Sequence, residues 1–332
     1  MNLQALKNRL RMLAGAFAIA LALPAAAQDK MQLQLNWFHL ADHSPIYLAL
    51  KKGYYKEENI DLTVLRGSGS ADAAKKIDLG QADVGISDAP TVLTAISKGA
   101  NLKMVAVVYD KAGNNVFFRK SANIKTPKDL VGKKIAVPPA DSHRVLWPAF
   151  AAINGIDPAL VTLVNVKPEG KQAIVAAGEV DGSFDLYTSY AIWDKVLGKG
   201  EVGNLLWADF GLPIYGHTYF VNNDLLQKNP KLVERFLRAT HKGWRDAKAN
   251  PKASIDAMVE MVPGLDGPTL LATMPQILDL CVTERSAKHG LGWIEPELMQ
   301  KTMDITFATN KPEKAVAVND VFTNQYNSKI KP

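Results

Sequence analysis

Short apolar runs alternate with amphipathic stretches along the first two thirds of the chain. The runs are rich in Val, Ile and Leu, and the stretches between them carry apolar residues at helical spacing. This order predicts an α/β fold in which mainly parallel sheets are flanked by helices. One set of predicted strands comprises residues 31–37, 60–65, 83–86 and 102–109, and a second set comprises residues 134–137, 161–166 and 182–184 and ends near 205–209.

Two sets of strands predict two lobes. Two further runs, residues 115–119 and 217–221, lie where the chain would cross between the lobes at a hinge. The pattern after these runs is almost entirely helical, and we expect the C-terminal helices to cover the first lobe. The chain of 332 residues, about 300 of them after a predicted leader, also exceeds what one core usually supports. We therefore assign residues 28–115 and 222–332 to lobe 1 and residues 116–221 to lobe 2.

Helix boundaries can be placed at two positions from local signals. Ser44 before Pro45 predicts a helix start with Ser44 as its N-cap, and Gly53 predicts the end of that helix. In the second set, Pro148 predicts that a helix beginning at His143 either kinks or starts later.

The N-terminus has the order of a secretory signal peptide. Three basic residues at positions 7–11 precede an apolar stretch at 13–23, and small residues then lead to a predicted cleavage site near Ala27. A membrane anchor is the alternative, but about 11 apolar residues are fewer than the roughly 20 that span a bilayer. No cysteine stands at the cleavage site to carry a lipid. Residues 1–27 are therefore predicted to be a signal peptide of an exported protein.

Composition excludes several classes of protein. Without the three basic residues of the leader, the chain has 36 Lys and Arg and 33 Asp and Glu, a net charge of +3. No block of five or six like charges occurs. Nucleic acid and membrane surfaces are therefore not predicted partners. Cys281 is the only cysteine, so no intramolecular disulfide can form. The sequence contains no G-x-S-x-G, no H-E-x-x-H and no Cys/His pair at a meaningful spacing, which predicts a binding protein without a cofactor and not an enzyme.

Residues that follow the predicted strands of lobe 1 are candidates for a cleft, because open α/β folds bind ligands at the carboxyl ends of their strands. Trp37 offers a π face and an N–H donor for an aromatic or heterocyclic solute, or else packs in the core. His39 and His43 have the i, i+4 spacing of metal ligands, with His143 or His217 as distant partners. Because the helix starts after both residues, we favour hydrogen bonding to a solute over a metal.

Two turns in lobe 1 carry further candidates. The stretch "LRGSGSAD", residues 65–72, could cradle an anion with its amides, or it is a tight connection in which Ser70 caps a helix. In "GISDAP", Ser87 and Asp88 end a strand before a helix, so these two residues cap the helix, contact a ligand, or both.

Lobe 2 contributes a second group of candidates. Ser142, His143 and Arg144 are donors after a strand, and Arg144 suits a carboxylate, sulfonate or phosphate unless it forms a surface ion pair. Asp185 could accept from a cationic or amino-bearing heterocycle, or cap a helix, and Tyr187 follows at the same strand end. Beside the second crossing, Tyr215 and His217 could close over a ligand or pack the hinge.

Four stretches in order, "LNWFHLADHSPIYLALKKGYYKEENIDL", "GQADVGISDAP", "DLVGKKIAVPP" and "INGIDPALVTLVNV", resemble the solute-binding components of ABC transporters that take thiamine pyrimidine precursors, nitrate, sulfonates and taurine. The resemblance covers nearly the whole chain after the leader. It implies a two-lobed periplasmic binding protein fold, hinge closure around a small solute, a permease partner in the inner membrane, a monomer and a periplasmic location.

Within this class, the first stretch looks most like the branch that binds pyrimidine precursors. That match implies that Trp37, His43 and Tyr47 line the cleft. Phe38, His39 and Leu40 depart from it, because that branch usually has proline and asparagine there. We therefore expect an aromatic or heterocyclic solute.

Three alternatives remain open at this point. The protein could bind a small anion such as an alkyl sulfonate, nitrate or an aromatic carboxylate. It could resemble the fungal pyrimidine synthase of the same fold class, which consumes its own histidine, but the cysteine-rich run of that enzyme is absent. It could also dock on a receptor as a sensor and not on a permease.

Overall fold

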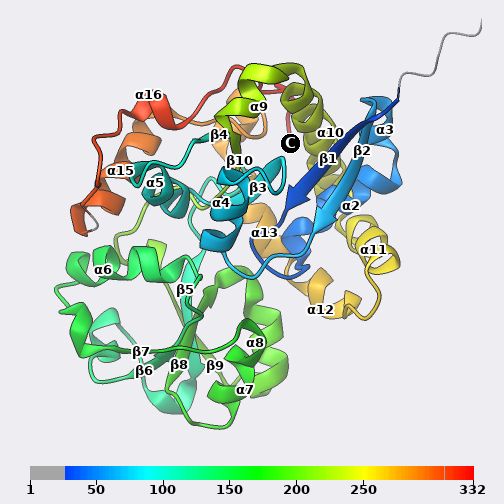
Figure 1. Cartoon of the computed structure of the whole chain (residues 1–332). Helices are drawn as coiled ribbons and strands as arrows, with labels where there is room; N and C mark the ends of the chain where they lie inside the picture. The colour runs from blue at the N-terminus through cyan, green and yellow to red at the C-terminus, as the bar shows by residue number, and fades with distance from the viewer. Residues whose placement is uncertain (1–26, 310) are drawn as a thin grey trace, which may run out of the picture.

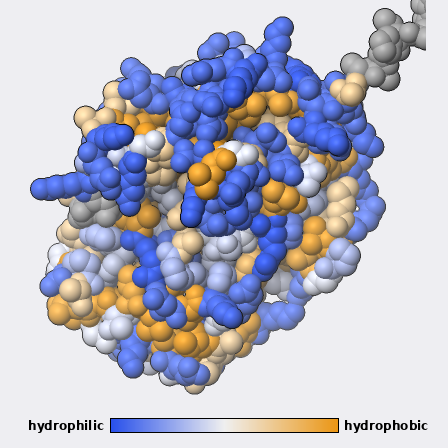
Figure 2. All heavy atoms as spheres, in the orientation of Figure 1, coloured by the Kyte–Doolittle hydropathy of each residue, from blue (hydrophilic) through white to orange (hydrophobic). Residues whose placement is uncertain are grey.

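The computed structural model describes residues 27–309 and 311–332, which form two lobes, one above the other in Figure 1. Residues 1–26 of the predicted signal peptide lie outside the described residues. Within the described part of the chain, no helix is both long enough and apolar enough to cross a membrane. Hydrophilic residues cover most of the face shown in Figure 2, with apolar residues in small patches between them.

The first lobe is built on a five-stranded sheet in the order β2-β1-β3-β10-β4. Its strands are β1 (Asp29–Gln34), β2 (Ile60–Leu65), β3 (Val84–Asp88), β4 (Leu102–Val107) and β10 (His217–Asn222). The strands β2, β1 and β3 pair in parallel, whereas β10 pairs antiparallel with both β3 and β4. The sheet is therefore mixed, with one reversed strand.

The second lobe repeats this arrangement in the order β7-β6-β8-β5-β9. Its strands are β5 (Asn114–Arg119), β6 (Lys134–Ala136), β7 (Thr162–Val164), β8 (Gly182–Leu186) and β9 (Val202–Leu206). Here β5 is the reversed strand, paired antiparallel with β8 and β9. In each lobe, the reversed strand is the one that follows a crossing between the lobes. It lies next to an edge strand, with β10 beside β4 and β5 beside β9. The predicted α/β fold with two lobes is confirmed.

Sheet membership differs from the assigned limits of lobe 2 at both ends. Residues 217–221 were assigned to lobe 2, but β10 belongs to the first sheet because its backbone pairs with β3 and β4. The residues at positions 114 and 115, assigned to lobe 1, begin β5 of the second sheet. The sequence pattern located both crossings but could not show which sheet each crossing strand joins.

Helices cover both faces of the first sheet. Between its strands lie α2 (Ser44–Lys51), α3 (Tyr54–Glu57), α4 (Ser70–Asp78) and α5 (Ala89–Ser97). The C-terminal helices return to this lobe as predicted, and α10 and α11 pack against α2 (Figure 1). They are α9 (Asn223–Lys228), α10 (Pro230–Ala249), α11 (Pro251–Met261), α12 (Gly267–Ala272), α13 (Met274–Cys281), α14 (Glu284–His289), α15 (Pro296–Thr309) and α16 (Val318–Val321).

The second lobe has three α-helices, α6 (His143–Ile153), α7 (Lys171–Ala176) and α8 (Tyr190–Leu197), among its described residues. Its core is aromatic, with Phe150 stacked on Trp207 at a centroid distance of 4.4 Å. Helix α6 begins at His143 and continues through Pro148, so it does not start later.

The start of α2 differs from the prediction. The N-cap position is His43, and Ser44 is the first helical residue. The Ser44 hydroxyl donates to the Ser254 hydroxyl at 2.9 Å and does not cap the helix. Gly53 follows the helix end with φ +77°, a conformation that glycine adopts without strain, as its sequence position predicts.

The lobes touch through backbone at Gly69. A Cβ atom at Gly69, where φ is +155°, would lie 2.6 Å from the carbonyl oxygen of Ala140 in lobe 2. The Ala71 N–H donates to that same oxygen at 3.3 Å. A side chain at position 69 would therefore hold the lobes apart.

We expect Gly69→Ala to destabilise the closed arrangement by about 1–3 kcal/mol, the usual effect of overpacking. Small-angle X-ray scattering should then show a larger radius of gyration than for the wild type. Gly80→Ala is the control, because Gly80 also has positive φ but its Cβ would meet nothing within 4 Å. Equal scattering from wild type and Gly69→Ala would contradict this prediction.

Candidate functional site between the two lobes

A cavity with a volume of about 30 Å³ lies between the lobes, and we call it the inner cavity. Lobe 1 contributes seven of its lining residues, namely Asn36, Trp37, Leu40, Asp42, His43, Ser70 and His217. Lobe 2 contributes six, namely Asp141, Ser142, His143, Lys171, Asp185 and Leu186.

Strand ends position most of these side chains. Strand β1 ends at Gln34, and the segment that follows it carries residues 36–43 into the cavity before α2 begins. In lobe 2, Asp141 and its neighbours follow β6, whereas Asp185 lies at the end of β8. The inner cavity therefore lies at the carboxyl ends of the parallel strands, where open α/β folds bind ligands.

A chain of buried hydrogen bonds crosses the wall in lobe 1. The His43 Nδ1 accepts from the Leu40 N–H at 3.2 Å, so its Nε2–H donates to the Asn36 Oδ1 at 3.2 Å. The Asn36 amide nitrogen then donates to the His217 Nε2 at 3.1 Å. This order of donors and acceptors leaves the His43 ring neutral, and burial also lowers the pKa of His43.

Asp42 ends this chain with an acceptor that has no partner. Its Oδ2 accepts from the Tyr109 hydroxyl at 2.9 Å and lies 3.5 Å from the His217 Nδ1. Burial alone would raise the pKa of Asp42, but the neighbouring His43, His217 and Tyr109 hold it below its ordinary value. The other oxygen, Oδ1, is buried without a hydrogen bond. A buried carboxylate oxygen without a donor is unfavourable, so this atom calls for a donor from a ligand.

In lobe 2 a buried lysine lies between two carboxylates. The Lys171 Nζ is 3.3 Å from both the Asp141 Oδ2 and the Asp185 Oδ1, and the lysine is 1% exposed. Burial would lower the pKa of Lys171, but the two carboxylates raise it above its ordinary value. The pKa of Asp141, which burial would raise, is held low by Lys171 and His143.

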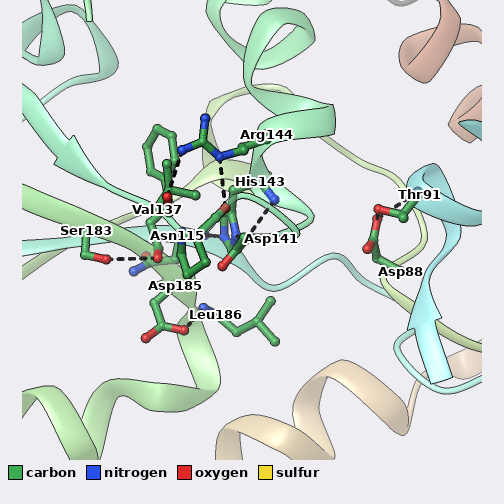
Figure 3. A network of polar contacts seen from close by, with 12 residues as sticks. Asp88, Thr91, Asn115, Val137, Asp141, His143, Arg144, Ser183, Asp185 and Leu186 are labelled. Atoms are coloured by element: carbon green, nitrogen blue, oxygen red, sulfur yellow. Dashed lines mark hydrogen bonds and ion pairs between the residues drawn. The ribbon is translucent and has the colours of Figure 1, made fainter. Parts of the chain in front are cut away.

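His143 orients Asp141 (Figure 3). The His143 Nε2 accepts from the backbone N–H of Asn115 at 3.3 Å, so the proton is on Nδ1, which donates to the Asp141 Oδ1 at 2.6 Å. This pairing fixes the neutral tautomer of the ring. Three carboxylates, those of Asp42, Asp141 and Asp185, thus face the inner cavity with the single ammonium of Lys171.

The Trp37 ring has two close neighbours. The Lys171 ammonium lies 5.0 Å from the ring centroid, and the Phe38 ring is stacked at 5.2 Å. A flat solute that stacks on a face of Trp37 covered by one of these neighbours would have to move it aside.

Six predicted site residues line the inner cavity: Trp37, His43, Ser70, Ser142, His143 and Asp185. They come from both lobes, and the sequence had placed each of them after a predicted strand or in a turn. Their role in binding a ligand stays a prediction.

Four predicted residues in lobe 1 do not line the inner cavity. His39 and Tyr47 contact each other, with 2.8 Å between the Tyr47 hydroxyl and the His39 Nδ1. The Ser87 hydroxyl donates to the Ser70 carbonyl at 3.3 Å. Asp88 caps α5 by accepting from the Thr91 N–H at 3.0 Å, and it lies apart from the cluster in Figure 3.

The remaining three predicted residues also make contacts elsewhere. Arg144 donates to the backbone carbonyls of Pro138 and Val137 at 2.9 and 2.8 Å. Its guanidinium therefore bonds to the backbone and not to an acidic side chain in a surface ion pair. The Tyr215 hydroxyl is buried and accepts from the Glu295 N–H at 2.8 Å. Tyr187 is half-buried at the start of a 3-10 helix, Tyr187–Ser189, outside the inner cavity.

Sequence reasoning missed four of the polar residues in the cavity, Asn36, Asp42, Asp141 and Lys171. It weighed His217 as a residue that closes over a ligand or packs the hinge, and as a distant metal partner. Asp141 had a signal, since it precedes the predicted donors by one residue, but Lys171 stands alone in a polar stretch. No group of three or more His, Cys, Asp or Glu side chains in the described residues could hold a metal ion.

The two lobes with a polar cavity between them define a periplasmic binding protein fold. The alkanesulfonate-binding protein SsuA from Xanthomonas axonopodis pv. citri, bound to MOPS, superimposes with a TM-score of 0.69 at 18% identity, covering 90% of this chain and 99% of that chain. The chain belongs to the NMT1/THI5 like family, whose model matches residues 40–254.

Two relatives in sequence have different roles. The formylaminopyrimidine-binding protein of Halalkalibacterium halodurans is 22% identical over 301 residues, 90% of this chain and 91% of that protein. The 4-amino-5-hydroxymethyl-2-methylpyrimidine phosphate synthase of Legionella pneumophila is 24% identical over 250 residues, 74% of this chain and 77% of that protein. The similarity thus extends to a binding protein and to an enzyme.

Proposed function

We propose that this protein is the periplasmic solute-binding component of an ABC importer and that it captures a small heterocycle with an amino group or a positive charge between its lobes. One observation carries this proposal. The inner cavity presents the carboxylates of Asp42, Asp141 and Asp185 against the single ammonium of Lys171.

Asp141 already accepts from Lys171 and His143, and Asp185 from Lys171 and Trp193, so the acceptor left for a solute is on Asp42. The Asp42 Oδ1 is buried without a partner, and an exocyclic amine or a protonated ring nitrogen would supply the missing hydrogen bond. Trp37, Leu40 and Leu186 give the same cavity an apolar wall. Apolar walls with a few convergent polar groups are typical of sites for small organic ligands.

The alternative of a small anion is less well supported. Arg144, the guanidinium proposed for an anion, donates to backbone carbonyls and is not among the lining residues. The glycines of the turn at 65–72 serve close packing, since Cβ atoms at Gly67 and Gly69 would overlap Leu35 and Ala140. Lys171, the ammonium in the cavity, already has two carboxylate partners.

The family supports a pyrimidine-like solute, because its relative in Halalkalibacterium halodurans is a formylaminopyrimidine-binding protein. Binding would favour the closed arrangement through contacts that only the closed lobes make, and a permease would then accept the closed, monomeric protein. The synthase relatives leave enzyme activity as the contrasting function. Cys281, the only cysteine, is buried, and burial raises its pKa, which disfavours the thiolate that binds iron.

A thermal-shift screen tests the proposed function. The purified protein is heated with 4-amino-2-methylpyrimidine, with 2-methylpyrimidine as the matched compound without the amine, and with methanesulfonate and nitrate. A ligand at 100 times its Kd stabilises the native state by about 2.7 kcal/mol. We expect stabilisation by the aminopyrimidine and a much smaller shift with the other three compounds.

Stabilisation by methanesulfonate or nitrate alone would contradict the proposal and favour the anion alternative. Iron-dependent loss of a histidine, detected by intact mass, would favour the synthase.

A further inference from the structure

A second pocket adjoins the inner cavity, and we call it the outer pocket. It has a volume of about 280 Å³ and lies between the segment after β1, the 3-10 helix Pro168–Gly170, α7 and α8. Much of its wall is apolar, with Phe38, Ile192 and Val196 among the lining residues. Val196 is 41% exposed, although a valine gains from leaving water.

Four residues are common to the two spaces. Trp37, Leu40, Lys171 and Asp185 line both the inner cavity and the outer pocket. The two spaces therefore adjoin, and a solute that reaches from one to the other would pass beside the buried ion pair of Lys171 and Asp185.

The polarity changes from one space to the other. Asp42, His43 and His217 line only the inner cavity, whereas Phe38, Ile192 and Val196 line only the outer pocket of the pair. A solute that fills both spaces would therefore carry nitrogen donors at one end and an apolar group at the other.

The outer pocket lies beside a contact between the two lobes. Glu169 of lobe 2 lines the pocket and accepts from Arg66 of lobe 1 at 3.0 Å. The Arg66 guanidinium also lies 4.1 Å from the centroid of Phe38, which lines the same pocket. A group in the outer pocket would therefore be held by both lobes at once.

We infer that the outer pocket is a second subsite, which takes an apolar or aromatic substituent of the same solute whose nitrogen donors are held in the inner cavity. This inference rests on the proposed function. It narrows the solute to amino-bearing heterocycles with an apolar extension of the ring.

The experiment compares two probes, 4-amino-2-methylpyrimidine and the same ring with a benzyl group at carbon 5. Isothermal titration calorimetry with the wild type should show that the benzyl compound binds at least tenfold more tightly. Val196→Trp, which fills the outer pocket, and Val196→Glu, which charges its wall, should each remove this gain and leave the Kd of the parent ring within twofold of the wild type.

Leu160→Trp is the matched control, because Leu160 is an exposed residue of lobe 2 that does not line the outer pocket, and it should retain the tenfold gain. Equal binding of the two probes to the wild type would overturn the second subsite alone. So would a gain that survives both Val196 variants. Failure of both probes to bind would overturn the proposed function, and the second subsite with it.

Discussion

Replacing Lys171 with methionine is expected to lower the free energy of unfolding at pH 7 by about 3–5 kcal/mol. The substitution keeps most of the side-chain volume but removes the ammonium that lies 3.3 Å from both Asp141 and Asp185. Two buried carboxylates would then face each other without a cation. Denaturant unfolding followed by tryptophan fluorescence measures the change, since Trp147, Trp193 and Trp207 belong to the same lobe.

Lys195→Met is the control for this prediction. Lys195 pairs with Asp266, but their side chains are 66% and 40% exposed, so removing that ammonium should change stability by less than about 1 kcal/mol. Equal effects of the two substitutions would show that the buried cluster contributes no more than a surface ion pair.

The pH dependence of the Lys171→Met effect has a definite sign. The pKa of Asp141 is lowered in the folded wild type, so its contribution to stability is present above the unfolded value of about 3.9 and is lost as pH falls through the folded value. The difference in unfolding free energy between wild type and variant should therefore be large at neutral pH and shrink below about pH 4.

Asp42→Asn is expected to weaken the binding of 4-amino-2-methylpyrimidine by about 2 kcal/mol, or roughly 30-fold, given the proposed function. The asparagine has the shape of the aspartate, but it replaces a charged acceptor, and a hydrogen bond to a charged group contributes about 1.5–3 kcal/mol. The orphan Oδ1 of Asp42 is the atom that this ligand is expected to bond. Isothermal titration calorimetry measures the loss.

Asp88→Asn provides the matched control, because Asp88 is also a buried carboxylate of lobe 1 but caps α5 outside the inner cavity. It removes the same charge and should leave the Kd within twofold of the wild type. A 30-fold loss in both variants would point to the overall charge of the lobe and away from a direct bond to Asp42.

Much of the fold could be predicted from the sequence because its signals are local. The predicted strand at 60–65 matches β2 in both limits. A short apolar run bounded by polar residues indicates a buried strand without any information from the rest of the chain. Prolines at the starts of α10 and α11 likewise mark those helices. The first strand was predicted to reach Trp37, but β1 ends at Gln34 and a hydrogen-bonded segment follows.

The polar part of the site could be predicted only in part, because its contacts join residues far apart in the chain. Asn36 bonds to His217, and Lys171 bonds to Asp141, across separations that no local pattern reports. Arg144 was expected to serve a ligand because of its charge, but the free carbonyls after β6 bind its guanidinium first. The charge of Arg144 makes it a candidate, but only the folded structure shows which groups compete for its guanidinium.

The place of β10 has a consequence for the order of folding. Strands β3 and β4 are not neighbours in the first sheet, because β10 lies between them and bonds to both. The first sheet therefore has a gap until the chain has passed through all five strands of lobe 2 and returned at His217. Lobe 2 is built from one continuous segment, so it can fold on its own contacts before β10 completes the sheet of the first lobe. Pairing across such a sequence separation is slow, because the entropy of closing the loop is lost before any contact forms.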